Sequence, residues 1–240
     1  MRGLRGAGTP SLSAIPSFAQ AFVVDASVPR DLVAFARKLN ELGLNPGRAG
    51  NASARTGDAF LITPSGLPYD ALAEEDLVVV DEAGRAKGVH APSSEWRLHR
   101  DIYAAHADAR AIVHTHSPFA TTLACLRRGI PPFHYEVAFA GGADIRCGTY
   151  ATFGTQELSD ACLAALEGRR ACLLANHGAV AYGGDLRAAV ELARKVEALA
   201  QIYWQALQVG EPALLDAAEM ARVAERLASY GANGPAASDR

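Results

Sequence analysis

Segments with helical spacing alternate with short apolar strands along most of the chain. Expected strands lie at 51–55, 59–63, 77–80, 111–116 and 171–175, and expected helices begin at Pro29, after Ser94, and at Pro118, Thr155, Asp185 and Asp216. The helical segments carry apolar residues three and four positions apart, so each has one face to bury. Such an alternation is typical of a layered α/β domain in which helices cover a sheet.

The length of the chain favours a single domain. A chain of 240 residues can bury roughly 70–75% of the surface that it exposes when unfolded, which is enough for one core. We expect this domain to span residues 29–240. Residues 1–28 are rich in small residues and contain no acidic residue before Asp25. We expect them to form a disordered extension. No apolar run approaches the ~20 residues of a membrane span, so no membrane partner is expected.

Charge and cysteine content exclude several classes of function. The formal net charge is −3, so no basic excess points to a nucleic-acid partner. Of the 23 basic residues only three are lysines, which disfavours an enzyme that forms a Schiff base on a desolvated lysine. The other basic residues are arginines, whose planar guanidinium group is suited to bind phosphate with two hydrogen bonds. The four cysteines form no C-x-x-C pair, which is typical of reduced thiols in a cytoplasmic protein.

A pair of histidines at the end of an expected strand gives the strongest local signal. In 111–117, AIVHTHS, side chains alternate between the faces of the strand, so His114 and His116 share one face about 6–7 Å apart. One metal ion can bridge that separation. His177 follows the apolar strand at 171–175 and precedes Gly178, at a turn where it is either structural or functional. Three histidines without a cysteine partner fit an open zinc site.

Residues before the second expected helix are suited to bind an anion. Ser93 and Ser94 cap exposed backbone N–H groups there, and the same groups and the helix dipole favour phosphate. Glu95 falls in the first turn, where a carboxylate is stabilised in any case, and His99 one turn later is interpreted as local helix support. The Gly-containing loops at 45–51 and 63–66 can add backbone N–H groups to a phosphate cradle, although each alone is simply a loop.

With these motifs the chain resembles the class II aldolase/adducin family. The matching stretches, in family order between about residues 30 and 231, are GLNPGRAGN, LITPSGLPY, PSSEW, VHTH, PPFHYEVA, AGGADI, YATFGTQELS, NHG and SYG. The resemblance implies a layered αβα fold with a central, mostly antiparallel sheet flanked by helices. It also implies a cytoplasmic homotetramer with active sites at subunit boundaries.

The resemblance assigns a role to each matching residue. His114, His116 and His177 are similar to the three ligands of one zinc ion per subunit. Glu95 is similar to the carboxylate that coordinates zinc in the resting site and then acts as general base and acid. The residues that match the phosphate cradle are Asn51, Ser65, Gly66, Ser93 and Ser94.

Two tyrosines and one arginine complete the comparison. Tyr135 is similar to a tyrosine that a neighbouring subunit lends to the aldehyde side, and Tyr230 to a mobile C-terminal tyrosine near the active site. Arg48 departs from the family pattern, which has a small hydroxyl residue there, and this difference bears on which phosphorylated substrate is held and how tightly.

These residues predict a zinc-dependent lyase that cleaves a ketose 1-phosphate into dihydroxyacetone phosphate and a small aldehyde. Breaking a C–C bond next to a carbonyl leaves an enediolate, whose charge a Lewis acid stabilises and whose proton a carboxylate moves. The expected substrate is L-fuculose 1-phosphate, giving L-lactaldehyde, and the alternative is a 5-deoxy-pentulose 1-phosphate, giving acetaldehyde. 

Other readings stay open. Within the family they are a 4-epimerase of L-ribulose 5-phosphate and a decarboxylase of a sugar-acid phosphate; the epimerases place Asp where this chain has Glu95. A non-catalytic binding module of the adducin-head type lacks the metal histidines. A zinc hydrolase is the alternative from outside the family.

Overall fold

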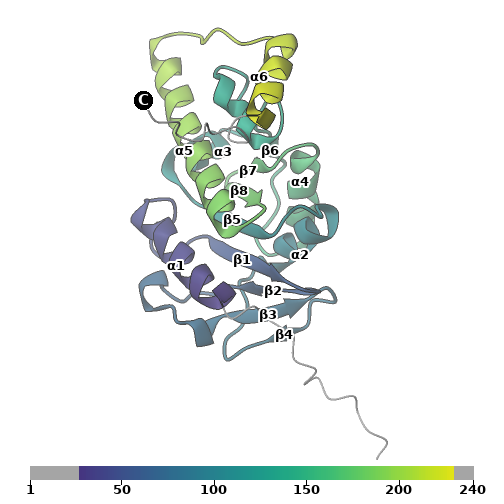
Figure 1. The fold of residues 1–240 in the computed structure, drawn as a ribbon. Coiled ribbons are helices and arrows are strands. Elements are labelled where there is room, and N and C mark those ends of the chain that lie inside the picture. Colours follow the sequence, from purple (N-terminus) through teal and green to yellow (C-terminus); the bar gives the residue numbers. More distant parts are fainter. Residues whose placement is uncertain (1–26, 230–240) are drawn as a thin grey trace, which may run out of the picture.

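An eight-stranded sheet forms the centre of the protein (Figure 1). The structure is a computed structural model and describes residues 27–229. The strands are β1 (Asn51–Thr56), β2 (Ala59–Ile62), β3 (Val78–Asp81), β4 (Ala86–Lys87), β5 (Ala111–Thr115), β6 (Cys147–Gly148), β7 (Ala171–Leu174) and β8 (Gly178–Gly183). Their order is β4-β3-β2-β1-β5-β8-β7-β6, and every pair except β6–β7 is antiparallel.

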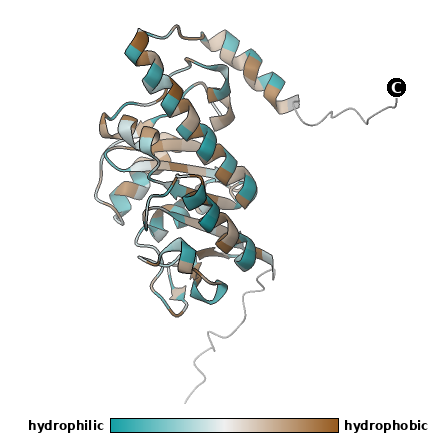
Figure 2. Cartoon of the chain, turned by 90° about the vertical axis from the view of Figure 1, so that its left-hand side faces the viewer, coloured by the Kyte–Doolittle hydropathy of each residue, from teal (hydrophilic) through white to brown (hydrophobic). Residues whose placement is uncertain are grey.

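Helices cover both faces of this sheet. The α-helices are α1 (Ser27–Glu41), α2 (Trp96–Ala105), α3 (Pro118–Cys125), α4 (Gln156–Leu166), α5 (Leu186–Val209) and α6 (Ala217–Ser229), and three 3-10 helices are η1 (Tyr69–Ala71), η2 (Glu74–Asp76) and η3 (Tyr135–Ala140). Most of the α-helices carry hydrophobic and hydrophilic residues in turn along their length, as expected of helices between a core and solvent (Figure 2).

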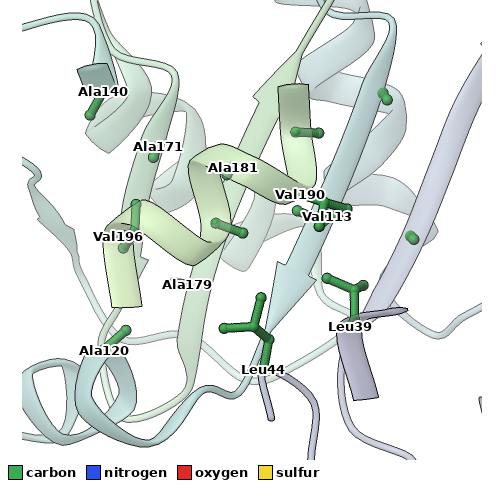
Figure 3. Packing of buried hydrophobic residues seen from close by; sticks show 14 of the residues in the cluster. Leu39, Leu44, Val113, Ala120, Ala140, Ala171, Ala179, Ala181, Val190 and Val196 are labelled. Atoms are coloured by element: carbon green, nitrogen blue, oxygen red, sulfur yellow. The ribbon is translucent and has the colours of Figure 1, made fainter. Parts of the chain in front are cut away.

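Two separate hydrophobic layers fill the space between sheet and helices. Helices α1, α3 and α5 enclose the larger layer, of which Figure 3 shows Val113, Ala179 and Ala181 from the sheet with Val190 and Val196 from α5. Helices α2 and α4 enclose the other layer on the opposite face. Neighbouring residues of β5 enter different layers, since Ile112 faces α2 and α4 while Val113 faces α5. The predicted αβα fold with a mostly antiparallel sheet is confirmed.

The ends of the predicted elements differ from the structure by a few residues. Helix α1 begins at Ser27, two residues before the expected start, and the strand expected at 111–116 ends at Thr115, so His116 lies just beyond it. Strand β8 was not expected, although it lies at the centre of the sheet between β5 and β7. Residues 1–26, which make up most of the expected extension, lie outside the described residues.

Helix α3 begins two residues after His116 and is fixed by a carboxylate from α5. Both oxygens of Glu197 accept hydrogen bonds from the first turn of α3, from the backbone N–H groups of Phe119 (2.9 Å) and Ala120 (2.8 Å). A carboxylate at this position satisfies helix N–H groups and interacts favourably with the helix dipole. The chain that follows His116 is therefore tied to α5, the longest of the described helices. Among the helices between residues 27 and 229, none has the length and apolar character needed to cross a membrane.

Candidate active site

Three histidines meet at one end of the central strands. His114 lies at the end of β5, His116 directly after it, and His177 in the turn between β7 and β8. Their donor nitrogens all lie within 4.8 Å of one another, and the Nε2 atoms of His114 and His116 are 2.9 Å apart. The nitrogens are closer than the strand spacing predicts because His116 is no longer held in the strand and its ring turns toward His114. The three predicted ligands are thus brought together.

The turn between β7 and β8 has the backbone that this arrangement needs. Asn176 adopts a left-handed conformation with φ of 55°, which asparagine tolerates better than most residues. Gly178 leaves room for the neighbouring strand, because a Cβ there would lie 2.2 Å from the carbonyl oxygen of Thr115. The Asn-His-Gly sequence is therefore required to bring His177 against the end of β5.

The imidazole rings are held in the neutral form that binds metals. Burial, together with the nearby His116, lowers the pKa of His114 to about 3. Burial also lowers the pKa of His116, and it lowers that of His177 to about 4. The Nδ1–H of His114 donates to the carbonyl oxygen of Ala179 at 3.0 Å, which leaves its Nε2 lone pair facing the other two rings.

A buried carboxylate completes the cluster. Glu95, the residue before α2, is 6% exposed; its Oε2 lies 3.2 Å from His114 Nε2 and its Oε1 lies 3.3 Å from His177 Nε2. Oε1 accepts no hydrogen bond from any described residue. A buried carboxylate facing neutral imidazole lone pairs is costly unless a cation lies between them. Three imidazoles and a carboxylate therefore fit a divalent metal such as zinc.

The residues predicted to bind phosphate line one cavity beside this cluster. The cavity has a volume of about 330 Å³, and its walls include Asn51, Ser65, Gly66, Ser93 and Ser94 together with Glu95, His116 and His177. Two backbone hydrogen bonds join the serine loops, from Ser65 N to the Ala91 carbonyl and from Ser93 N to the Thr63 carbonyl, both 3.1 Å. Arg48 reaches the same cavity and is exposed. Hydroxyl groups, a glycine turn and a guanidinium thus surround one space.

The two predicted tyrosines are not among the described residues that line this cavity. Tyr135 begins η3, is 49% exposed, and lines a different cavity between η3 and α6. Its expected place is in the site of a neighbouring subunit, so the single chain does not test that role. Tyr230 lies outside the described residues. The catalytic and binding roles of all these side chains stay predictions.

Several residues near the site were not predicted. Asn45 accepts a hydrogen bond from the His116 backbone N–H at 3.2 Å, and a Cβ on Gly50 would lie 2.4 Å from its Oδ1. Tyr150 and Phe153 form an exposed aromatic wall of the cavity. The motifs GLNPGRAGN and YATFGTQELS contain these residues, but spacing alone assigns them no contact.

The interpretation of His99 as local helix support is wrong. Its two ring nitrogens contact Asn51 and Ser53 of β1 and make no hydrogen bond within α2. The ring is fully buried and does not line the cavity. His99 therefore connects α2 to the central sheet.

Comparisons with known proteins agree with this fold and site. The family model described as the class II aldolase and adducin N-terminal domain matches residues 30–204. The chain therefore belongs to the class II aldolase and adducin family, as its motifs predict.

Relatives with named activities are similar over nearly their whole length. The chain is 57% identical to the 5-methylthioribulose-1-phosphate/5-deoxyribulose-1-phosphate aldolase of Rhodospirillum rubrum over 84% of this chain and 91% of that protein. It is 43% identical to the L-fuculose phosphate aldolase of Escherichia coli strain K12 over 84% of this chain and 94% of that protein. A solved structure of L-fuculose 1-phosphate aldolase, 41% identical, superposes with a TM-score of 0.83 over 85% of this chain and 98% of that one. The protein is a metal-dependent lyase of the class II aldolase type.

Replacement of one ring tests the metal centre. We expect His116→Ala to lower zinc affinity by at least about 10–100-fold. Loss of a residue that only hydrogen-bonds a metal ligand already has an effect of this size, and loss of a ligand should have a larger one. Zinc affinity is measured by competition with a chromophoric chelator, and metal content by mass spectrometry. His90→Ala is the control, since His90 is exposed and bonds Asp76 far from the cluster. An unchanged affinity in His116→Ala would remove this residue from the ligand set.

The stability of the metal-free protein should fall on acidification. His99, His114 and His177 have folded-state pKa values of about 3, 3 and 4, below the ordinary value near 6.5, so the unfolded chain binds more protons. Their contribution to stability is complete above pH 6.5 and is lost as the pH falls from there toward 4 for His177 and toward 3 for His99 and His114. Each group contributes up to about 1.4 kcal/mol per pH unit. Urea unfolding between pH 7 and pH 5 measures this slope, because ordinary carboxyl groups titrate lower. A flat profile would contradict the buried neutral state.

Proposed function

We propose that this enzyme cleaves a ketose 1-phosphate into dihydroxyacetone phosphate and a small aldehyde by reversible retro-aldol chemistry, with one zinc ion per subunit. The observation that carries the proposal is the joining of two half-sites in one cavity. His116, His177 and the Glu95 carboxylate line this cavity and belong to one cluster with the buried His114, and a cradle of hydroxyl and N–H groups lines the same cavity. A phosphate bound in that cradle would hold the substrate carbonyl toward the histidines.

The residues of the chain divide the chemistry among them. The cradle of Asn51, Ser65, Gly66, Ser93 and Ser94 binds the phosphate, and Arg48 adds a positive charge. Zinc would be held by the three histidines, with Glu95 beside it, and would supply Lewis acidity that stabilises the developing negative charge. Cleavage leaves an electron pair on the carbon next to the carbonyl. Glu95 delivers the proton to that carbon, and removes it in the synthetic direction.

The aldehyde side is proposed to come partly from a second subunit. Tyr135 is exposed away from the cavity of its own chain, which is consistent with a phenol that serves the site of a neighbouring subunit. There it would exchange a proton with the aldehyde oxygen, near the C-terminal Tyr230. This arrangement requires the homotetramer that the family resemblance implies. We propose that the protein works in the cytoplasm through a single catalytic domain at residues 29–240.

Two kinds of aldehyde distinguish the candidate substrates. We place 5-deoxyribulose 1-phosphate and its 5-methylthio analogue first, because the relative named for them is 57% identical, compared with 43% for the relative named for L-fuculose phosphate. The wall formed by Tyr150 and Phe153 supports this order, since aromatic rings contact methyl and thioether groups favourably. L-fuculose 1-phosphate is the second candidate, supported by the solved structure that superposes with a TM-score of 0.83.

Product release tests the proposal directly. Zinc-loaded protein should release dihydroxyacetone phosphate from 5-deoxyribulose 1-phosphate, measured by coupled reduction with NADH and glycerol-3-phosphate dehydrogenase, and excess chelator should stop the release. Glu95→Gln should keep its zinc, through the histidines, and lose about 10²–10⁴-fold in kcat because the proton can no longer be transferred.

Two results would contradict this assignment. Turnover that survives in Glu95→Gln would remove Glu95 from proton transfer. A wild-type protein that holds zinc but releases no dihydroxyacetone phosphate from any of the three ketose phosphates would not be this aldolase. Conversion of L-ribulose 5-phosphate to its 4-epimer, with no product of C–C bond cleavage, would then identify the epimerase alternative.

Arg48 should determine how tightly the phosphate is held. Its guanidinium reaches the cavity, and a hydrogen bond to a charged group contributes about 1.5–3 kcal/mol, so Arg48→Ala should raise KM roughly 10–100-fold with a smaller change in kcat. Steady-state kinetics with 5-deoxyribulose 1-phosphate measure this split. Arg194→Ala removes a matched exposed arginine from α5 and should leave KM unchanged. An unchanged KM in Arg48→Ala would show that the guanidinium does not bind the substrate.

A further inference from the structure

A continuous chain of buried hydrogen bonds leads from helix α2 to the Glu95 carboxylate. The Tyr103 hydroxyl lies 2.8 Å from Ser53 Oγ, and Ser53 Oγ lies 2.7 Å from His99 Nδ1. The His99 Nε2 atom lies 2.5 Å from Asn51 Oδ1, and Asn51 Nδ2 donates to Glu95 Oε2 at 2.9 Å. All five residues are at most 6% exposed. The chain is therefore buried along its length and meets the cavity only at Asn51 and Glu95.

The direction of every hydrogen bond in this chain follows from its acidic end. A carboxylate only accepts, so the nitrogen of the Asn51 amide faces Glu95 and the oxygen faces His99. That oxygen also only accepts, so His99 carries its proton on Nε2. Burial lowers the pKa of His99 to about 3, so the ring is neutral and Nδ1 accepts from the Ser53 hydroxyl. Ser53 in turn accepts from Tyr103.

The orientation of the Asn51 amide matters for both halves of the site. Asn51 lines the cavity as well as contacting Glu95, so one N–H is used on the carboxylate and the amide nitrogen has a second N–H to offer an anion. A flipped amide would place its oxygen against the carboxylate and present an acceptor where an anion binds. Asn51 itself does not favour one orientation, because its oxygen and nitrogen are nearly equal in size.

We propose that His99 is a positioning residue that fixes the Asn51 amide, through its Nε2–H, in the orientation that both Glu95 and the substrate phosphate require. His99 lies outside the cavity walls and contacts neither the metal-binding nitrogens nor the cavity, so it acts only through Asn51. The phosphate part of this inference rests on the proposed function, whereas the contact with Glu95 does not.

Two substitutions of the same position separate positioning from packing. In His99→Gln the side-chain amide nitrogen takes the place of Nε2 and can still donate to Asn51, whereas the shorter His99→Asn reaches only the place of Nδ1, near Ser53. With zinc-loaded full-length protein and 5-deoxyribulose 1-phosphate, we expect His99→Asn to lower kcat/KM about 10–100-fold, the usual loss for an outer-shell residue. His99→Gln should restore most of this activity. Thermal melting should show similar losses of stability in both variants.

Action through Asn51 predicts a non-additive pair. In an Asn51→Ala background, His99→Asn should cause little further loss of kcat/KM, because the group that it orients is gone. The pair His106→Asn and His106→Gln is the control, since His106 is bonded to Tyr182 away from the cavity and neither change should alter kcat/KM. Equal losses in His99→Asn and His99→Gln, or additive losses with Asn51→Ala, would overturn the proposal in favour of simple packing.

A binding measurement keeps this inference separate from the proposed function. Calorimetric titration of the zinc-loaded proteins with inorganic phosphate should show weaker binding in His99→Asn than in wild type, with His99→Gln between them. If the three proteins bind phosphate in this order of affinity but the wild type cleaves no ketose phosphate, the proposed function fails and the role of His99 stands. If phosphate binds equally well to all three proteins while cleavage proceeds with equal kcat/KM, the role of His99 fails and the function stands.

Discussion

The register of three antiparallel strands determines the whole site. Strand β5 lies between β1 and β8, where it pairs His114 with Asn51 on one side and with Val180 on the other. Backbone hydrogen bonds fix this register, and a shift by one residue would turn every side chain to the opposite face. Asn51 thus lies beside the metal-binding strand, and Ala179 comes close enough to accept the His114 Nδ1–H. The backbone hydrogen bonds between these strands therefore determine which side chains meet at the cavity, although no side chain takes part in those bonds.

Most of the fold was predictable from sequence because apolar spacing reports burial directly. Helices α1, α2, α4 and α5 bury one face each, and β2 and β3 are short, largely apolar segments. Strand β8 was missed for a physical reason: its sequence, GAVAYG, contains little of the β-branched and aromatic content that marks a strand. Its small residues are needed where α5 packs on the sheet, since a Cβ on Gly183 would lie 2.7 Å from the Ala189 nitrogen.

The site was predictable to the extent that its residue types are unusual. Three histidines at strand ends and a serine pair before a helix indicated metal and phosphate binding. The structure gathers the histidines in one cluster, and two of them line a cavity together with the serine pair. His99 has no such signal, because its partners Asn51 and Ser53 lie almost fifty positions away in the chain. Tyr135 shows a further limit, since the role proposed for it in the site of another subunit depends on assembly rather than on the fold of its own chain.

Rigidity is distributed unequally across the two halves of the cavity. The metal-binding half is held by central strands and by a buried network, as a site must be when its ligands have to converge within a few ångströms. The proposed anion-binding half consists of loops with glycine turns and the exposed Arg48, whose guanidinium can bind a phosphate by charge as well as by geometry. Asn51 belongs to both halves, and its amide is fixed from behind by His99. A retro-aldol site requires this link, because the distance between the bound phosphate and the bond that breaks is set by the substrate. The protein must therefore hold its carboxylate in fixed relation to the cradle.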